Sequence, residues 1–380
     1  MNILLKRRFF NATLFACIAI AAGLNSLSQQ VFAQTAEGVS RTSITLGQTT
    51  ALTGASSALA LPFHQGARLY FERVNATGGI NGRTINLVSM DDAGNAVTAK
   101  ANAQKLIQAG AFALFGSYGE ASTMSVHEVV KETSTIVFAP QTSSDELHGA
   151  NFPTLYFIRP GDSEQGIAVI RHAETLGMRK LAIVHAPDSE AVSSAEAAER
   201  SMNALGANLS SKRLLTQLDQ ALATSPQSLL VISDAKAAAT AIKAARSKGF
   251  RGPIYGFSDT GESLLAEQLG ASGAGVVLAR VVPRSDNAKS VVVRELIADA
   301  QAAKLGKPNV YMLEGYISAR ALVEALRKAG KDLTQAKLRK AIEGISEWDM
   351  GGFRISFDGG RTGSKLVELS LIDSVGKVRE

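Results

Sequence analysis

Apolar and polar residues follow two recurring patterns along most of the chain, one with a period of two residues and one with a period near 3.6. Residues 43–49 and 84–90 have the apolar, strand-like composition, whereas residues 57–75 and 97–109 carry an apolar stripe typical of an amphipathic helix. Three shorter segments continue the alternation: 113–115, 122–132 and 136–139. Strands that alternate with helices indicate a parallel sheet covered by helices on both faces.

A second series of the same kind begins near Asp162. It opens with a helix at 165–176, a strand at 180–185 and a helix at 191–205. The predicted elements that follow are 229–233, 237–248, 254–257, 275–279, the long helices 288–303 and 310–329, a shorter helix at 333–342, and strands at 353–357 and 366–372 around a glycine-rich turn. Two series of similar length predict an α/β protein of two similar doubly wound lobes with parallel central sheets.

The first residues predict export. Residues 6–8 are basic, residues 9–24 are mostly apolar, and the small-residue rule is met at Ala33. This arrangement is typical of a secretory signal peptide, so we expect residues 1–33 to be removed and the mature chain to reach the periplasm. Weaker likenesses to a twin-arginine signal and to a lipoprotein box at Cys17 are the alternatives.

Composition narrows the class of protein. The chain has 380 residues, enough for two domains, and 46% of them are hydrophobic, which indicates a globular core. The net charge of +6 falls to +3 without residues 1–33, because three of the basic residues lie there and no acidic one does. So mild a charge argues against nucleic acid as a partner.

The same composition argues against cofactors, metals and covalent catalysis. Cys17 is the only cysteine and lies in the predicted signal peptide, and the five histidines are far apart in sequence. Three glycine-rich stretches, 256–261, 270–275 and 360–365, lack the spacing of a nucleophile elbow, a dinucleotide fingerprint or a phosphate loop, and are predicted to be turns. We therefore expect no enzyme, no cofactor and no metal site.

Two segments carry a sharper signal. The strand at 113–115 runs into residues 116–123, and the strand at 136–139 runs into residues 140–146; both turns contain small hydroxylated residues before a predicted helix. Free N–H groups at a helix start can bind an anion, and open α/β sheets bind ligands beyond the carboxyl ends of their strands. Helix capping by Ser and Thr without any ligand explains the same pattern, so both interpretations stay open.

Several segments resemble one known family. Residues 74–83, Val-Asn-Ala-Thr-Gly-Gly-Ile-Asn-Gly-Arg, are close to its hallmark, and residues 47–54, 115–117, 159–162 and 357–361 fit its pattern. The chain is similar to the branched-chain amino-acid binding proteins, the leucine-binding family of type I periplasmic solute-binding proteins. The resemblance covers nearly the whole mature chain and is stronger in its first lobe.

The resemblance implies a Venus-flytrap fold, with lobe one at 41–161 and 283–363 and lobe two at 162–282 and 364–380. It implies a solute-binding component of an ABC importer that captures an amino acid or amino-acid-like small molecule for a membrane permease. We expect the protein to be a monomer. A sensory protein that binds a small carboxylate, aromatic acid or amide is the alternative, and an envelope enzyme is disfavoured.

The resemblance also implies the ligand site. In relatives, the turns that match residues 120–122 and 141–143 hold the ligand's carboxylate, and an acidic residue matching Asp259 can hold its ammonium. The predicted ligand-binding residues are Glu120, Ala121, Ser122, Gln141, Thr142, Ser143, Asp259, Leu59, Tyr118 and Glu190.

The sequence departs from the family at the predicted site. Leu59 and Glu190 stand where relatives often carry aromatic residues, and Gly94 and Gly119 replace a disulfide that many relatives have. The pocket is therefore not expected to copy the leucine site. For Asp259, capping of the following helix is the competing explanation.

Overall fold

The computed structural model describes residues 37–379, which form one compact unit. The predicted signal peptide lies outside the described residues. Two large sheets organise the unit, one of five strands and one of seven, together with a two-stranded sheet. Between residues 37 and 379, none of the helices combines the length and apolar character that a membrane crossing needs.

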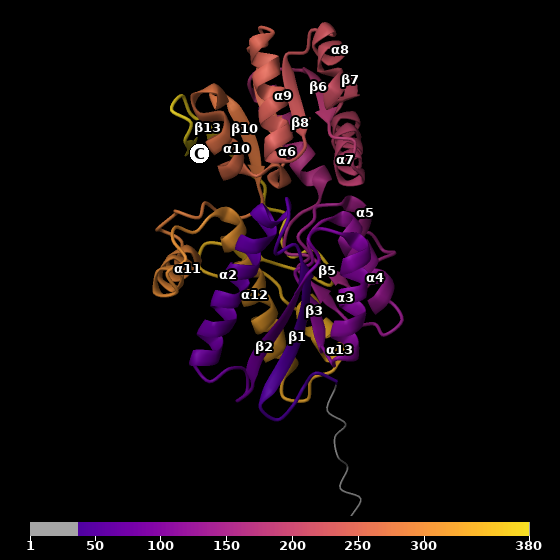
Figure 1. Ribbon diagram of the computed structural model, residues 1–380, viewed down its shortest axis with the longest axis vertical. Coiled ribbons are helices and arrows are strands. Elements are labelled where there is room, and N and C mark those ends of the chain that lie inside the picture. Colours follow the sequence, from indigo (N-terminus) through magenta and orange to yellow (C-terminus); the bar gives the residue numbers. More distant parts are fainter. Residues whose placement is uncertain (1–36, 380) are drawn as a thin grey trace, which may run out of the picture. The chain divides into compact units, whose positions relative to one another are not determined.

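The first sheet is parallel throughout, in the order β2-β1-β3-β4-β5. Its strands are β1 (Ser43–Thr50), β2 (Thr84–Asp91), β3 (Ala113–Phe115), β4 (Val137–Phe138) and β5 (Leu155–Tyr156). Around it lie α2 (Ser57–Ala76), α3 (Ala96–Gln108), α4 (Glu120–Val130), α5 (Asp145–His148), α11 (Val291–Ala302), α12 (Val310–Ala329) and α13 (Gln335–Glu343) (Figure 1). The late helices α11–α13 thus complete the lobe that the early strands begin.

Helices α2 and α12 pack against each other along most of their length. Two glycines allow this close approach. A Cβ atom at Gly66 would lie 1.9 Å from the carbonyl oxygen of Met312, and one at Gly315 would lie 1.9 Å from that of Phe63. Any larger residue at either position would force the two helices apart.

The second sheet has the order β14-β13-β10-β9-β8-β6-β7. Its parallel strands are β6 (Lys180–His185), β7 (Asn208–Leu214), β8 (Ser228–Ile232), β9 (Ile254–Gly256) and β10 (Val276–Arg280), and β13 (Glu368–Ile372) and β14 (Val378–Arg379) add an antiparallel edge. Its α-helices are α6 (Asp162–Thr175), α7 (Ser189–Leu205), α8 (Leu218–Ala223), α9 (Ala235–Ser247) and α10 (Glu262–Leu269), and the short 3₁₀ helices are η1 (Leu215–Gln217), η2 (Ser258–Thr260) and η3 (Gly270–Gly273).

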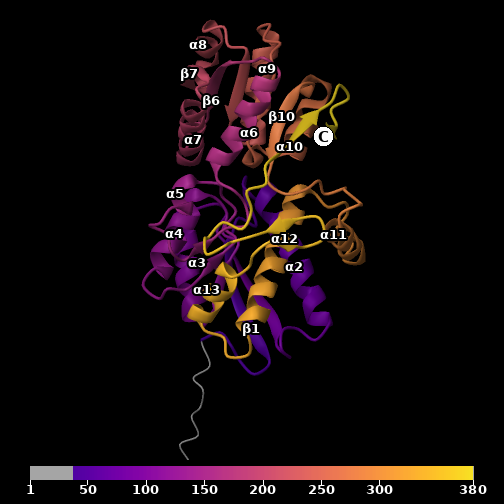
Figure 2. The same cartoon turned by 180° about the vertical axis from the view of Figure 1, so that it is seen from behind.

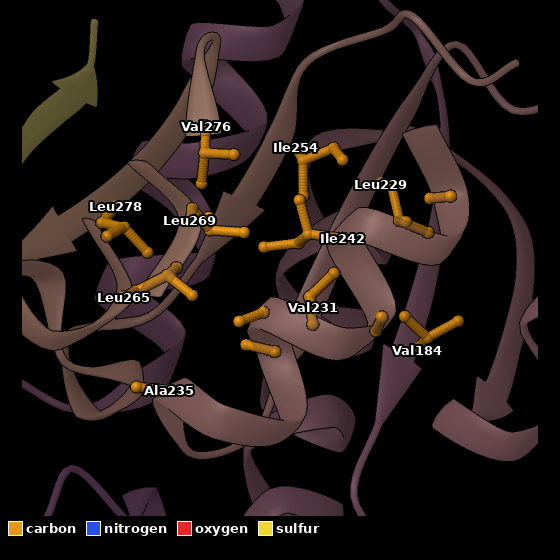
Figure 3. Packing of buried hydrophobic residues seen from close by; sticks show 14 of the residues in the cluster. Val184, Leu229, Val231, Ala235, Ile242, Ile254, Leu265, Leu269, Val276 and Leu278 are labelled. Carbon is orange, nitrogen blue, oxygen red and sulfur yellow. The ribbon is translucent and has the colours of Figure 1, made fainter. Parts of the chain in front are cut away.

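Side chains of the second sheet point alternately to its two faces and form a hydrophobic core on each face. Val184, Leu229 and Val231 point to the face covered by α8, α9 and α10, where Ile242 of α9 meets them (Figure 3). Their sequence neighbours, including Ile183, point to the opposite face, against α6 and α7. Successive side chains of a strand point to opposite faces, so these nearly continuous apolar runs are buried on both sides.

The chain passes between the two lobes three times within the described residues. The connections lie after β5, after β10 and before β13, in residues 157–161, 281–290 and 356–367. The last of them is the yellow segment that Figure 2 shows from behind.

The α/β class with two lobes and parallel central sheets is confirmed. The strands expected at 353–357 and 366–372 belong to different sheets. There, β12 (Arg354–Ile355) pairs with β11 (Trp348–Asp349), whereas β13 pairs with β10.

Candidate functional site

A cavity of about 220 Å³ lies where strands of both sheets end. From the second lobe, its lining follows the carboxyl ends of β6, β8 and β9, which are neighbours in the sheet. From the first lobe, Ser56 precedes α2 and Tyr118 follows β3. This is the position at which open α/β sheets bind ligands.

Two carboxylates in this lining stand at helix starts. Asp188 is the N-cap of α7, and its side chain accepts a hydrogen bond from the Ala191 N–H at 3.0 Å. Asp234 is the N-cap of α9 and accepts from the N–H groups of Lys236 and Ala237 at 2.8 and 3.0 Å. Capping fixes both carboxylates at the cavity wall, because the side chain must face its own helix start.

Glu190 lies in the first turn of α7 and contacts the other lobe. Its Oε1 accepts a hydrogen bond from the Thr142 hydroxyl at 3.1 Å. Burial, together with the nearby negative charge of Asp259, raises the pKa of Glu190 to about 8. A carboxyl group in this state exchanges its proton near neutral pH.

Asp259 belongs to the short helix η2 and pairs with a buried arginine. Its Oδ1 lies 2.6 Å from Nη1 of Arg159, whose side chain is only 1% exposed. Arg159 Nε also lies 3.0 Å from Oε1 of Glu314 on α12. The capping explanation for Asp259 is wrong, because α10 begins after Gly261 and has no side-chain cap.

In the first lobe, the turn before α4 is closed by a glycine. Gly119 adopts φ +81°, a conformation that glycine tolerates best, and α4 then begins at Glu120. The Glu120 Oε1 accepts a hydrogen bond from the Ser193 hydroxyl of α7 at 3.2 Å, and burial raises the pKa of Glu120. No side chain caps α4, so Ser122, which is buried, does not act as its cap.

The second predicted turn packs directly beside the first. Tyr118 and Gln141 form a parallel bridge, and Gln141, Thr142 and Ser143 are all buried. Among the described residues, neither the Gln141 amide nor the Ser143 hydroxyl has a hydrogen-bond partner. Helix α5 has no side-chain cap, so capping does not explain these residues.

The structure brings together part of the predicted residue set. Tyr118, Glu190 and Asp259 line the cavity. Thr142 and Glu120 contact lobe two, as described above. Leu59 is buried near Gly261, Ala121 is exposed, and Ser122, Gln141 and Ser143 are buried outside the lining.

The sequence interpretation missed several lining residues, among them Asp188, Ser194, Asp234 and Thr260. The strand-end rule that selected the turns of lobe one would have found Asp188 and Asp234, since each follows a strand and starts a helix. Across residues 37–379, no group of three or more histidine, cysteine, aspartate or glutamate residues is arranged to hold a metal ion.

Comparisons with known proteins agree with this architecture. A family model described as "Periplasmic binding protein" matches residues 43–367. A protein of Pseudomonas aeruginosa named "Amino acid binding protein" is 30% identical over 156 residues, which cover 40% of this chain and 42% of that protein. The "Leu/Ile/Val-binding protein" of Escherichia coli is 26% identical over 121 residues, 32% of this chain and 33% of that protein.

The chain therefore matches less than half the length of these curated relatives. In three dimensions it is similar to an extracellular ligand-binding receptor from Verminephrobacter eiseniae, with a TM-score of 0.82 and 24% identity, covering 89% of this chain and 100% of that one.

Proposed function

Because the chain belongs to the periplasmic binding protein family, we propose that it is the solute-binding component of an ABC importer. It captures an amino acid or amino-acid-like solute between its lobes and delivers it to a membrane permease. The signal peptide at residues 1–33 directs the chain to the periplasm. The family consists of solute-binding proteins and not of enzymes.

One observation carries this proposal: the two lobes meet through polar side chains beside a cavity that both of them line. Thr142 of lobe one donates to Glu190 of lobe two, and Ser193 of lobe two donates to Glu120 of lobe one. Polar side chains that already contact each other across the cleft can also hydrogen-bond a small solute that lies between them. A solute that contacts both lobes favours the closed form, because only that form makes both sets of contacts.

Within this proposal, lobe one comprises residues 41–161 and 283–363, and lobe two comprises residues 162–282 and 364–380. Ser122, Thr142 and Ser143, with the backbone around them, face the solute's carboxylate. The Ser143 hydroxyl and the Gln141 amide support this role, since both are buried and lack a partner in the described chain. Asp259 faces a positive group of the solute.

The test is a calorimetric screen of amino acids and related solutes, followed by small-angle X-ray scattering with the best binder. A solute present at a free concentration of about 100 times its dissociation constant should raise the free energy of unfolding by roughly 2.7 kcal/mol. The radius of gyration should become smaller when the solute saturates the protein. A scattering profile that stays the same at saturation would contradict capture between two lobes.

A further inference from the structure

Acidic side chains line the cavity between the lobes. Four carboxylates line it, those of Asp188, Glu190, Asp234 and Asp259, and none of the residues that line it in the described chain is lysine, arginine or histidine. They come from three separate strand ends of the second lobe, so they are not one run of acidic residues in the sequence. We call these four side chains the acidic wall.

Only part of this charge is neutralised. Arg159 pairs with Asp259, but Glu314 shares the same guanidinium and adds a negative charge of its own. The helix starts at Asp188 and Asp234 supply about half a positive charge each. With Glu190 protonated, as it is below its pKa of about 8, roughly two negative charges remain uncompensated around the cavity, by the same helix-dipole magnitude.

Two uncharged groups at the same cavity also point to a ligand. Thr260 lines the cavity and is only 3% exposed, and its hydroxyl has no hydrogen-bond partner in the described chain. The Tyr118 ring faces the acidic wall from lobe one: burial raises the pKa of its phenol, and the charges of Glu190, Asp259 and Asp234 raise it further. A buried hydroxyl without a partner loses the hydrogen bonds that it makes in water, and a bound solute can restore one.

We propose that the captured solute carries a net positive charge, as a small amine or guanidine does, and that the acidic wall selects for it. This inference rests on the proposed function and names the class of its solute. The negative charge of Asp259 contributes to the raised pKa of Glu190, and a cation bound beside this carboxyl group would lower that pKa.

The test compares solutes that differ in one group. Lysine and norleucine have the same carbon skeleton and differ in the terminal amine, whereas lysine and cadaverine differ in the carboxylate. Titration calorimetry of the purified protein should give lysine or cadaverine at least tenfold tighter binding than norleucine, with glutamate weaker still. Tighter binding of lysine than of cadaverine would identify the solute class as basic amino acids, and the opposite ranking would identify it as diamines.

Two variants test the acidic wall itself. Glu190→Gln and Asp234→Asn should each weaken binding of the better cation at least tenfold; the second retains the helix cap, because asparagine also caps helices. Glu174→Gln, an exposed position on α6, is the matched control and should bind as the unmodified protein does. Circular dichroism verifies that each variant is folded.

The outcomes separate this inference from the proposed function. Norleucine or glutamate binding as tightly as the cations would overturn the inference and leave solute capture intact. Unchanged cation affinity in both folded variants would also overturn it. A protein that binds no solute in this panel or in the wider amino-acid screen would contradict the proposed function, and the inference with it.

Discussion

The two sides of the cleft occupy equivalent places in their lobes but differ in charge. In the first lobe, Ser56 and Tyr118 line the cavity, and the two predicted turns carry Ser122, Gln141, Thr142 and Ser143, all uncharged and buried, with Glu120 as their acidic member. The acidic wall of the second lobe presents four carboxylates. Both follow the carboxyl ends of parallel strands, so the topology sets where a site can form and the turn residues set what it can hold.

This difference in charge means that the two lobes are suited to recognise different features of a solute. In the described chain, the buried Ser143 hydroxyl and Gln141 amide have no partners and are suited to hydrogen bonding, whereas carboxylates that no cation pairs discriminate by charge. The two sides are joined by Arg159, which follows β5 and holds Glu314 of α12 and Asp259 of the second lobe. The sharpest ways to test the comparison are therefore changes at this arginine, at the acidic wall and at the hydroxyl groups, in that order of expected effect.

Replacing Arg159 should have the largest effect. Arg159→Met leaves Asp259 and Glu314 without their shared cation, and Glu314 is only 3% exposed. Removing one partner of a buried ion pair costs about 3–5 kcal/mol, so the free energy of unfolding should fall by that amount in urea denaturation. The matched control is Arg171→Met, at an exposed position of α6, which should change stability by less than about 0.5 kcal/mol.

A second substitution shows whether the loss arises from charge. In Arg159→Met combined with Glu314→Gln, one of the two unpaired carboxylates is removed, so part of the lost stability should return. Equal stabilities of the single and the double variant would mean that lost packing, and not uncompensated charge, explains the effect at Arg159.

The acidic wall should make stability depend on pH. The ordinary pKa of a glutamate is 4.5, and that of Glu190 is raised to about 8. Between these values the folded chain keeps a proton that the unfolded chain has released, so the free energy of unfolding falls as the pH rises through that window. The charged and titratable groups that act on Glu190 are Asp259, Glu120, Arg159, Tyr118 and Asp162.

For a single titrating group, the free energy of unfolding changes by at most about 1.4 kcal/mol per pH unit. Urea denaturation between pH 5 and 8 should show a shallower decline for Glu190→Gln than for the unmodified chain, and the same decline for Glu174→Gln. Parallel curves for the unmodified chain and Glu190→Gln would show that Glu190 is not the group that holds the proton.

Much of the fold follows from the sequence because burial has a local period. Residues 310–329 were predicted as a helix, and α12 has these bounds, since its apolar residues extend over twenty positions. Four of the described strands were not predicted. β5, β11 and β14 have only two residues each, too few to show a period, and β7 has the polar sequence Asn-Leu-Ser-Ser-Lys-Arg-Leu at the edge of its sheet.

The site was less predictable for a different reason. Arg159 lies 100 positions from Asp259, and no local pattern links the two residues. The sequence places Asp259 at a strand end but does not show which cation reaches it. Asp188 and Asp234 follow the strand-end rule and were within reach of the sequence analysis, which applied that rule to the turns of lobe one and, in lobe two, to Asp259 alone.

The smallest expected effects concern the hydroxyl groups of lobe one, which should separate structural from solute-binding roles. Thr142→Val removes the hydrogen bond to Glu190, so the free energy of unfolding of the solute-free protein should fall by about 0.5–1.5 kcal/mol. Ser143→Ala removes a hydroxyl that has no partner in the described chain, so the solute-free protein should keep its stability within about 0.5 kcal/mol.

Ser143 should matter for binding even though it does not matter for stability, and calorimetry with the best solute measures this. If its hydroxyl faces the solute's carboxylate, Ser143→Ala weakens binding by about 0.5–1.5 kcal/mol while the backbone N–H donors of the turn remain. The double variant Thr142→Ala, Ser143→Ala should lose at least as much. Unchanged affinity in the double variant would move the carboxylate away from this turn. A solute that needs no contact there would be held by the acidic wall alone, as expected for a diamine that has no carboxylate to bind.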